Sequence, residues 1–159
     1  MENRDHERFM RLAIEQAHMA MRNKDRPIGA VVVHHQEVVG RAANGIYSDR
    51  SKIEHAELRV LESCSSYLFD HAHECTLYTT HQPCIMCLGA IAVSNVRRVV
   101  YGLADPESPG LDVINQIPYL RDRIDLYIGG ILEDDCRELW KEWISTGTRT
   151  PQQCPSPTQ

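Results

Sequence analysis

The sequence lacks any apolar run that approaches the roughly 20 residues a membrane-spanning helix needs, although 42% of its 159 residues are hydrophobic. It also lacks a basic excess, because 22 acidic residues outweigh 17 lysines and arginines and give a net charge of −5. Non-specific nucleic-acid binding depends on basic residues that neutralise phosphates, so this charge argues against a broad nucleic-acid-binding surface. Residues 1–8 carry charges of both signs with no apolar stretch after them, which is unlike a secretory signal. We therefore expect a cytoplasmic protein without a membrane span.

Cysteine is abundant, with six in this short chain. A disulfide framework would need a secretory context, whereas Cys84 and Cys87 form a C-x-x-C with a histidine upstream. Reduced thiols and a bound metal are the better interpretation. Three further cysteines occur in apolar patterns, where cysteine acts as a small buried hydrophobe: Cys64, Cys75 and Cys136.

Helical and extended patterns alternate along the chain and predict a single α/β domain over residues 1–146. About five strands and the helices between them would form a mixed sheet with helices on both faces. Residues 147–159 are rich in Gly, Thr, Pro, Gln and Ser, which indicates a disordered tail. The expected helices are 6–22, 55–65, one that opens at Pro83, and 132–143; the expected strands are 28–34, 37–43, 75–80, 96–102 and 124–128.

Two local features refine this prediction. Asn44 and Gly45 follow the second strand, and both tolerate positive φ, so we expect a turn there. Proline is favoured at a first helical position, and Pro83 would place Cys84 and Cys87 in the first turn of its helix. The helix dipole would there favour the thiolates that zinc requires.

His55, Cys84 and Cys87 form the three-ligand set that a catalytic zinc takes when its fourth position is left to water. Glu57 completes an H-x-E, which together with P-C-x-x-C is the signature of zinc-dependent nucleobase deaminases, here without a substitution. A structural zinc, or a packed histidine with two unpaired cysteines, is the alternative. A structural site normally has four protein ligands, and His81 is the one nearby candidate for a fourth. Because Glu57 has no role in a closed site, we favour catalytic zinc.

On these residues the chain resembles the cytidine and tRNA-adenosine deaminase superfamily, over roughly residues 5–145. The stretch from residues 27–30 to the last helix looks most like the purine-acting branch, which includes tRNA adenosine deaminases and guanine deaminases. Residues 77–80 and 83–87 also resemble fungal cytosine deaminases. The resemblance implies a three-layer αβα sandwich, a Zn²⁺ cofactor and a homodimer.

The resemblance also implies an enzyme, a zinc-dependent hydrolase that converts an amino-substituted purine or pyrimidine to the carbonyl product and releases ammonia. Zinc lowers the pKa of a bound water to about 7. Glu57 would take the water proton, deliver it to a ring nitrogen and help the amine leave. By the same resemblance Asn44, Ala56 and Pro83 contact the substrate, although Asn44 is equally well explained as a turn residue.

The substrate is left open between a small base or nucleoside and a tRNA. Residues 104–110 are acidic and lack the lysine that tRNA enzymes commonly have there, which favours a free nucleobase or nucleoside. His81 and Gln82 also replace the residues that the family commonly has before the Pro-Cys motif. The first alternative is a tRNA-specific adenosine deaminase that extrudes its target base. The second is a non-catalytic zinc-binding partner subunit, against which Glu57 argues.

Overall fold

Five strands form one mixed sheet in the computed structural model, which describes residues 3–108 and 110–146. The strand order is β2-β1-β3-β4-β5. β1 runs antiparallel to both β2 and β3, whereas β4 runs parallel to β3 and β5. The bounds are β1 Gly29–His34, β2 Glu37–Ala43, β3 Cys75–His81, β4 Arg98–Leu103 and β5 Leu126–Ile128.

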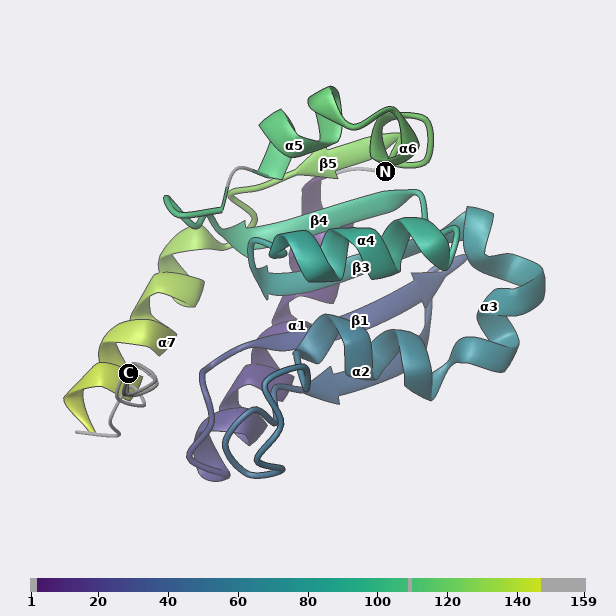
Figure 1. Cartoon of the computed structure of the whole chain (residues 1–159). Coiled ribbons are helices and arrows are strands. Elements are labelled where there is room, and N and C mark those ends of the chain that lie inside the picture. Colours follow the sequence, from purple (N-terminus) through teal and green to yellow (C-terminus); the bar gives the residue numbers. More distant parts are fainter. Residues whose placement is uncertain (1–2, 109, 147–159) are drawn as a thin grey trace, which may run out of the picture.

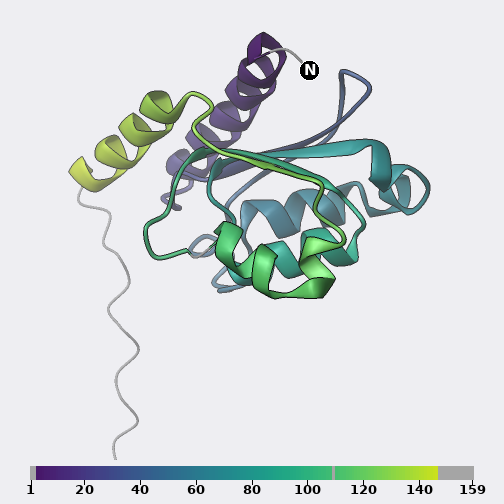
Figure 2. The same ribbon diagram turned by 90° about the horizontal axis from the view of Figure 1, so that it is seen from above.

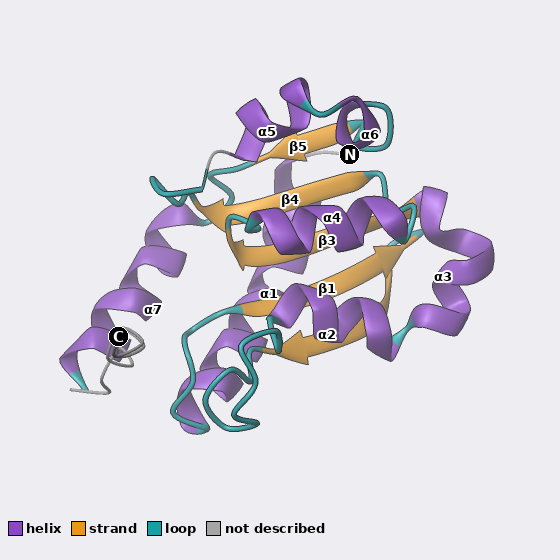
Figure 3. Ribbon diagram, in the orientation of Figure 1, coloured by secondary structure: helices purple, strands orange, loops and turns teal. Residues whose placement is uncertain are grey.

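Helices cover both faces of the sheet, so the expected α/β class and three-layer arrangement are confirmed. α1 (Asn3–Arg22) and α7 (Glu133–Ser145) lie on one face, and α2 (Ala56–Ser63) and α4 (Ile85–Val93) lie on the other (Figures 1 and 2). Among the described residues, no helix is both long and apolar enough to cross a membrane. The shorter helices, which Figure 3 shows at the edges, are α3 Ser65–His71, η1 Ala72–Glu74, α5 Gly110–Gln116 and α6 Pro118–Arg121.

The alternation of side chains along β1 divides the core into two layers. Val31 and Val33 pack with Phe9 of α1 and Cys136 of α7, whereas Val32 faces the α2 and α4 side. Successive strand residues point to opposite faces, and a strand covered on both faces reads as an apolar run, which explains the sequence of β1. The predicted burial of Cys64, Cys75 and Cys136 is confirmed, since each is at most 5% exposed.

The predicted strands all occur, but several other elements differ from the prediction. α3, η1, α5 and α6 were not expected, and the predicted tail 147–159 lies outside the described residues. α4 begins at Ile85, so Pro83 does not open it and Cys84 is its N-cap residue. The loop between β1 and β2 has positive φ at both His35 and Gln36, as a two-residue hairpin turn requires.

The reason expected for Asn44-Gly45 was wrong, because neither residue has a positive φ. Gly45 is instead needed for close approach. A Cβ at this position would lie 1.7 Å from Nη1 of Arg59 and 2.6 Å from Oδ2 of Asp49. The glycine therefore makes room for the ion pair between Arg59 and Asp49, whose atoms are 2.5 Å apart.

Candidate functional site

The N-termini of α2 and α4 bring the predicted metal ligands together. His55 is the N-cap residue of α2 and has extended backbone angles, while Cys84 has the same position at α4. Cys87 lies in the first turn of α4 and is fully buried. Each helix therefore presents its first residues at the end of the sheet where β3 stops.

The three ligand atoms are spaced as a tetrahedral zinc site requires. Nδ1 of His55 lies 3.7 Å from Sγ of Cys84 and 3.5 Å from Sγ of Cys87, and the two sulfurs are 3.6 Å apart. Zinc bonds of about 2.3 Å to sulfur and 2.0 Å to nitrogen, at tetrahedral angles, separate neighbouring ligands by about 3.5–3.8 Å. The donor set and its spacing both fit Zn²⁺.

The two thiols differ in acidity because they are hydrogen-bonded to each other. The hydrogen bond between Cys84 and Cys87, together with His55, lowers the pKa of the Cys84 thiol to about 3. The pKa of Cys87 is raised, first by that same bond and then by burial. The bond to Cys84 also raises the pKa of His55. Cys84 is therefore the more acidic of the two thiols, and zinc, which binds thiolates, would release the thiol protons that remain.

Glu57 lies beside this cluster and is 3% exposed. Its Oε1 accepts a hydrogen bond from Oγ1 of Thr79 at 3.0 Å, and its Oε2 lies 3.6 Å from Sγ of Cys87. Burial raises the pKa of the Glu57 carboxyl. A carboxyl with a raised pKa, held in place by Thr79 next to a metal site, is suited to taking up and releasing protons near neutral pH.

A cavity of about 340 Å³ opens onto this cluster. It falls in the size range of small-ligand pockets, about 300–1,000 Å³. Aromatic, basic and acidic side chains meet in its wall, as expected of a pocket for a polar heterocycle. The lining residues are Arg26, Ile28, His55, Glu57, His81, Gln82, Cys84, Asp105, Trp140 and Trp143.

His81 and Gln82, which depart from the family pattern, belong to the pocket wall. The His81 ring lies 5.2 Å from the Trp140 ring, and burial lowers the His81 pKa, which favours its neutral form. At this site the ligand atoms of His55, Cys84 and Cys87 all lie within 4.8 Å of one another. Among the described residues, His81 does not belong to this group. Gln82 accepts a hydrogen bond from the backbone N–H of Asp105 at 2.9 Å and so holds the loop after β4.

The three residues assigned to the substrate by resemblance lie outside the lining of the cavity. Ala56 is fully buried at the start of α2, and Asn44 is 2% exposed. Pro83 precedes the N-cap residue of α4, and its carbonyl accepts a hydrogen bond from Ser108 Oγ at 3.2 Å. Their substrate contacts stay a prediction.

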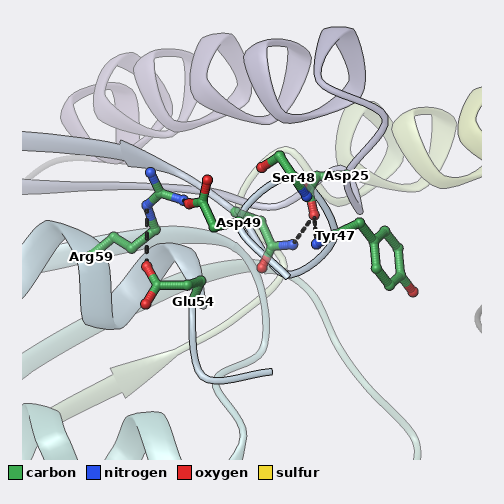
Figure 4. A network of polar contacts seen from close by, with 7 residues as sticks. Asp25, Tyr47, Ser48, Asp49, Glu54 and Arg59 are labelled. Atoms are coloured by element: carbon green, nitrogen blue, oxygen red, sulfur yellow. Dashed lines mark hydrogen bonds and ion pairs between the residues drawn. The ribbon is translucent and has the colours of Figure 1, made fainter. Parts of the chain in front are cut away.

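A buried carboxylate positions the loop that carries Asn44. Asp25 is fully buried and accepts hydrogen bonds from the backbone N–H groups of Tyr47 at 2.7 Å and Ser48 at 3.0 Å (Figure 4). Nδ2 of Asn44 also donates to Asp25, at 3.4 Å, whereas Oδ1 of Asn44 is buried without a hydrogen-bond partner. The loop is thus tied down from within, beside the pocket.

Sequence patterns alone did not identify four of the lining residues as functional candidates. Arg26 stands between the end of a helical pattern and a proline, and Asp105 belongs to an acidic stretch, so neither carries a sequence signal of a pocket wall. Trp140 and Trp143 are spaced like core residues of α7, and Trp143 is indeed 3% exposed, yet both also line the cavity. A Trp pair at helical spacing gives no sign of which wall it faces, so the structure was needed to place it.

Comparison with known proteins agrees with this geometry. Residues 4–131 match the family model for MafB19-like deaminases. A tRNA-specific adenosine deaminase of Bacillus subtilis is 35% identical over 134 residues, which cover 82% of this chain and 83% of that protein. A solved structure from studies of A-to-I editing by tRNA:A34 deaminases has a TM-score of 0.74 and 30% identity, and the match covers 83% of this chain and 98% of that one. The guanine deaminase of Bacillus subtilis has a TM-score of 0.57 and 29% identity, over 62% of this chain and 64% of that one.

Proposed function

The chain belongs to the MafB19-like deaminase family, and on this premise we propose that it is a zinc-dependent hydrolytic deaminase whose substrate is an adenosine in tRNA. The superfamily resemblance of its two motifs is confirmed by the family match and by relatives that are adenosine and guanine deaminases. The reaction is thus the hydrolytic removal of an amino group from a purine ring.

The observation that carries this proposal is the position of Glu57 between the metal-ligand cluster and the pocket. Its carboxyl is within 3.6 Å of Cys87 and lines the cavity, so a ring bound there would meet it directly. Thr79 donates to Oε1, and Oε2 faces the Cys87 thiol at the metal-ligand cluster, so Oε2 is the oxygen that would exchange protons. Glu57 would therefore hold the proton taken from water, pass it to a ring nitrogen and protonate the departing amine.

His55, Cys84 and Cys87 would hold the zinc, in line with their 3.5–3.7 Å spacing. When bound, the ion would supply a water whose pKa lies near neutrality. Trp140 would cover one side of the base, because an aromatic face is a sequence-tolerant surface for stacking. The neutral His81 beside it can donate or accept one hydrogen bond at the ring edge.

The relatives support adenosine in tRNA as the substrate, since the curated relative at 35% identity is a tRNA-specific adenosine deaminase. A free purine base is the second candidate. It is favoured by the net charge of −5 and by Asp105 in the pocket wall, where a phosphate would meet a like charge. The guanine deaminase at 29% identity is a relative that acts on a free base.

Ammonia release from a substrate panel tests the proposal. We expect turnover with an anticodon stem-loop that contains the target adenosine, and less or none with adenosine, adenine, guanine and cytosine. Inosine in the recovered RNA, measured by mass spectrometry after nuclease digestion, identifies the product. Turnover of guanine or adenine with an inert stem-loop would replace the tRNA proposal with the free-base one. No ammonia from any of them would contradict the proposed activity.

We further propose a cytoplasmic homodimer. Unpaired cysteines at Cys64, Cys75 and Cys136 suit a reducing compartment. α4 carries an apolar outer stripe, since Ile85 is 61% exposed, Val93 is 67% exposed, and a Cβ on Gly89 between them would meet no atom within 4 Å. A helix that is apolar on all sides is normally buried, so a second copy packed against this stripe would account for it.

The dimer is tested by one charge on that stripe. Wild-type protein is expected to sediment at twice the 18.1 kDa chain mass at micromolar concentration. Val93→Glu should give the single-chain mass, because the charge would be buried in the interface. The matched control is Ile144→Glu on α7, which is 66% exposed and should leave the dimer intact. Wild type that sediments as one chain would contradict the proposal.

A further inference from the structure

A second group of metal-ligand atoms lies at the opposite end of β1 and β3 from the His55 cluster. His34, His35 and Glu74 each offer one ligand atom, and these atoms all lie within 4.8 Å of one another. Along β1 the two ends are separated by the register positions from Ala30 to His34, roughly 13 Å of strand. Figure 1 shows that β1 ends beside α3, on the far side from the start of α4. The group is therefore independent of the proposed active site.

The two imidazoles meet at one oxygen of the carboxylate. Nε2 of His34 lies 3.5 Å from Oε2 of Glu74, and Nε2 of His35 lies 2.8 Å from the same oxygen. The rings of His34 and His35 are 4.1 Å apart, so both imidazoles approach the carboxylate from one side. The hairpin turn makes this possible, because the positive φ of His35 turns it back toward the end of β1.

The buried histidine of the group has the environment of a metal ligand. The His34 side chain is 11% exposed, and its Nε2 is buried without a hydrogen-bond partner. Its other nitrogen, Nδ1, lies 2.6 Å from the hydroxyl of Tyr67, and its ring stacks on His71 at 5.2 Å. When His34 donates its Nδ1–H to Tyr67, the lone pair of Nε2 faces Glu74. Metal-ligating histidines are characteristically held in this way by a second partner.

The carboxylate lies at the exposed end of the group, with its side chain 54% exposed, and faces both imidazoles. Nη1 of Arg98 donates to the backbone carbonyl of Glu74 at 3.1 Å, which fixes the backbone while the carboxylate stays with the histidines. When they bind through their lone pairs, two imidazoles and one carboxylate offer a divalent cation a ligand set of net charge −1.

We propose that His34, His35 and Glu74 bind a second Zn²⁺, with water completing its coordination. Two imidazoles and one carboxylate are a ligand set that zinc uses elsewhere, and the absence of thiolates makes this site weaker than the His55 cluster. The bound ion links the β1–β2 turn to η1 and, through Tyr67, to α3. Its role is to stabilise this end of the sheet.

Zinc titration of the purified full-length protein against a chromophoric chelator tests the proposal. Wild type is expected to bind two equivalents, and His35→Ala and Glu74→Gln only one. Tyr67→Phe should keep two equivalents with the second bound ~10–100-fold more weakly, as expected when the hydrogen-bond partner of a ligand is lost. The matched control is His18→Ala, which removes an exposed histidine of α1 and should leave both equivalents.

A second equivalent of zinc should also raise the Tm of wild type above its Tm with one equivalent bound. This rise should be absent in His35→Ala. The outcome is separable from that of the proposed active site. Wild type could bind a single equivalent of zinc that is lost in His35→Ala and kept in Cys84→Ala. That result would support the second site and contradict the zinc site at the His55 cluster. The proposal would be overturned if wild type bound a single equivalent of zinc that His35→Ala retained. It would also be overturned if Glu74→Gln still bound two equivalents.

Discussion

Glu57→Gln is expected to reduce ammonia release by at least ~10²–10⁴-fold, the usual loss when a general acid–base is removed. The reduction should lie at the upper end or beyond, because one carboxyl serves several proton transfers. Glutamine keeps the volume and can still accept from Thr79, the 3.0 Å partner of Oε1, so the side chain should keep its place. Zinc content and Tm should stay near wild type, since Glu57 is not a ligand. Turnover and zinc are measured on the same sample.

Glu62→Gln is the matched control, because Glu62 lies on the same helix and is exposed. It makes the same chemical change away from the pocket and should retain full turnover. Loss of zinc from Glu57→Gln would make Glu57 a structural residue. Retention of both zinc and full turnover would mean that another group moves the protons.

Cys84→Ala is expected to abolish turnover and to remove the zinc of the His55 cluster. The substitution takes away one of the three ligand atoms, the more acidic of the two thiols, whose pKa is lowered to about 3. A metal that binds the folded chain and not the unfolded one contributes its binding free energy to folding, so the free energy of unfolding should also fall. Elemental analysis and urea unfolding measure the two effects.

Cys64→Ala separates loss of metal from loss of a buried cysteine. Cys64 is 5% exposed in the core beneath α2 and belongs to neither metal-ligand group. Its replacement should destabilise by about 1 kcal/mol, as for an average substitution, and leave zinc and turnover unchanged. A Cys84→Ala protein with wild-type zinc at the His55 cluster would contradict the assignment of Cys84 as a ligand.

The sheet and the cluster of His55, Cys84 and Cys87 could be predicted from sequence because each has a local signal. Successive residues of β1 are buried on opposite faces of the sheet. The residues of the cluster belong to the H-x-E and P-C-x-x-C motifs, at the starts of two helices. The helices between β4 and β5 have no such signal, since α5 and α6 are seven and four residues long and bury few side chains. Short segments of this kind take their form from tertiary contacts rather than from periodicity.

The pocket wall was less predictable because it is assembled from segments that are far apart in the chain. Arg26 and Trp140 come from opposite ends of the sequence and meet only after α1 and α7 pack on the same face of the sheet. Neither has a pattern that distinguishes a lining residue from a surface or core residue. The second histidine group was missed for the same reason, since Glu74 is 39 residues from His35 and joins it through the pairing of β1 with β3.

The hydrogen bonds of Asp25 also fix the orientation of the Asn44 side-chain amide. Asp25 accepts from two backbone N–H groups, and the amide of Asn44 turns its NH₂ group toward Asp25 and its oxygen away from it. That oxygen is buried and unpaired, so any ligand atom that reaches it has to carry a hydrogen. A ring nitrogen with a lone pair at this point would face a second lone pair and be rejected. If Asn44 contacts the substrate, as the resemblance predicts, Asp25 would thereby limit the tautomers and ring substituents accepted at that contact, although Asp25 itself lies outside the pocket wall.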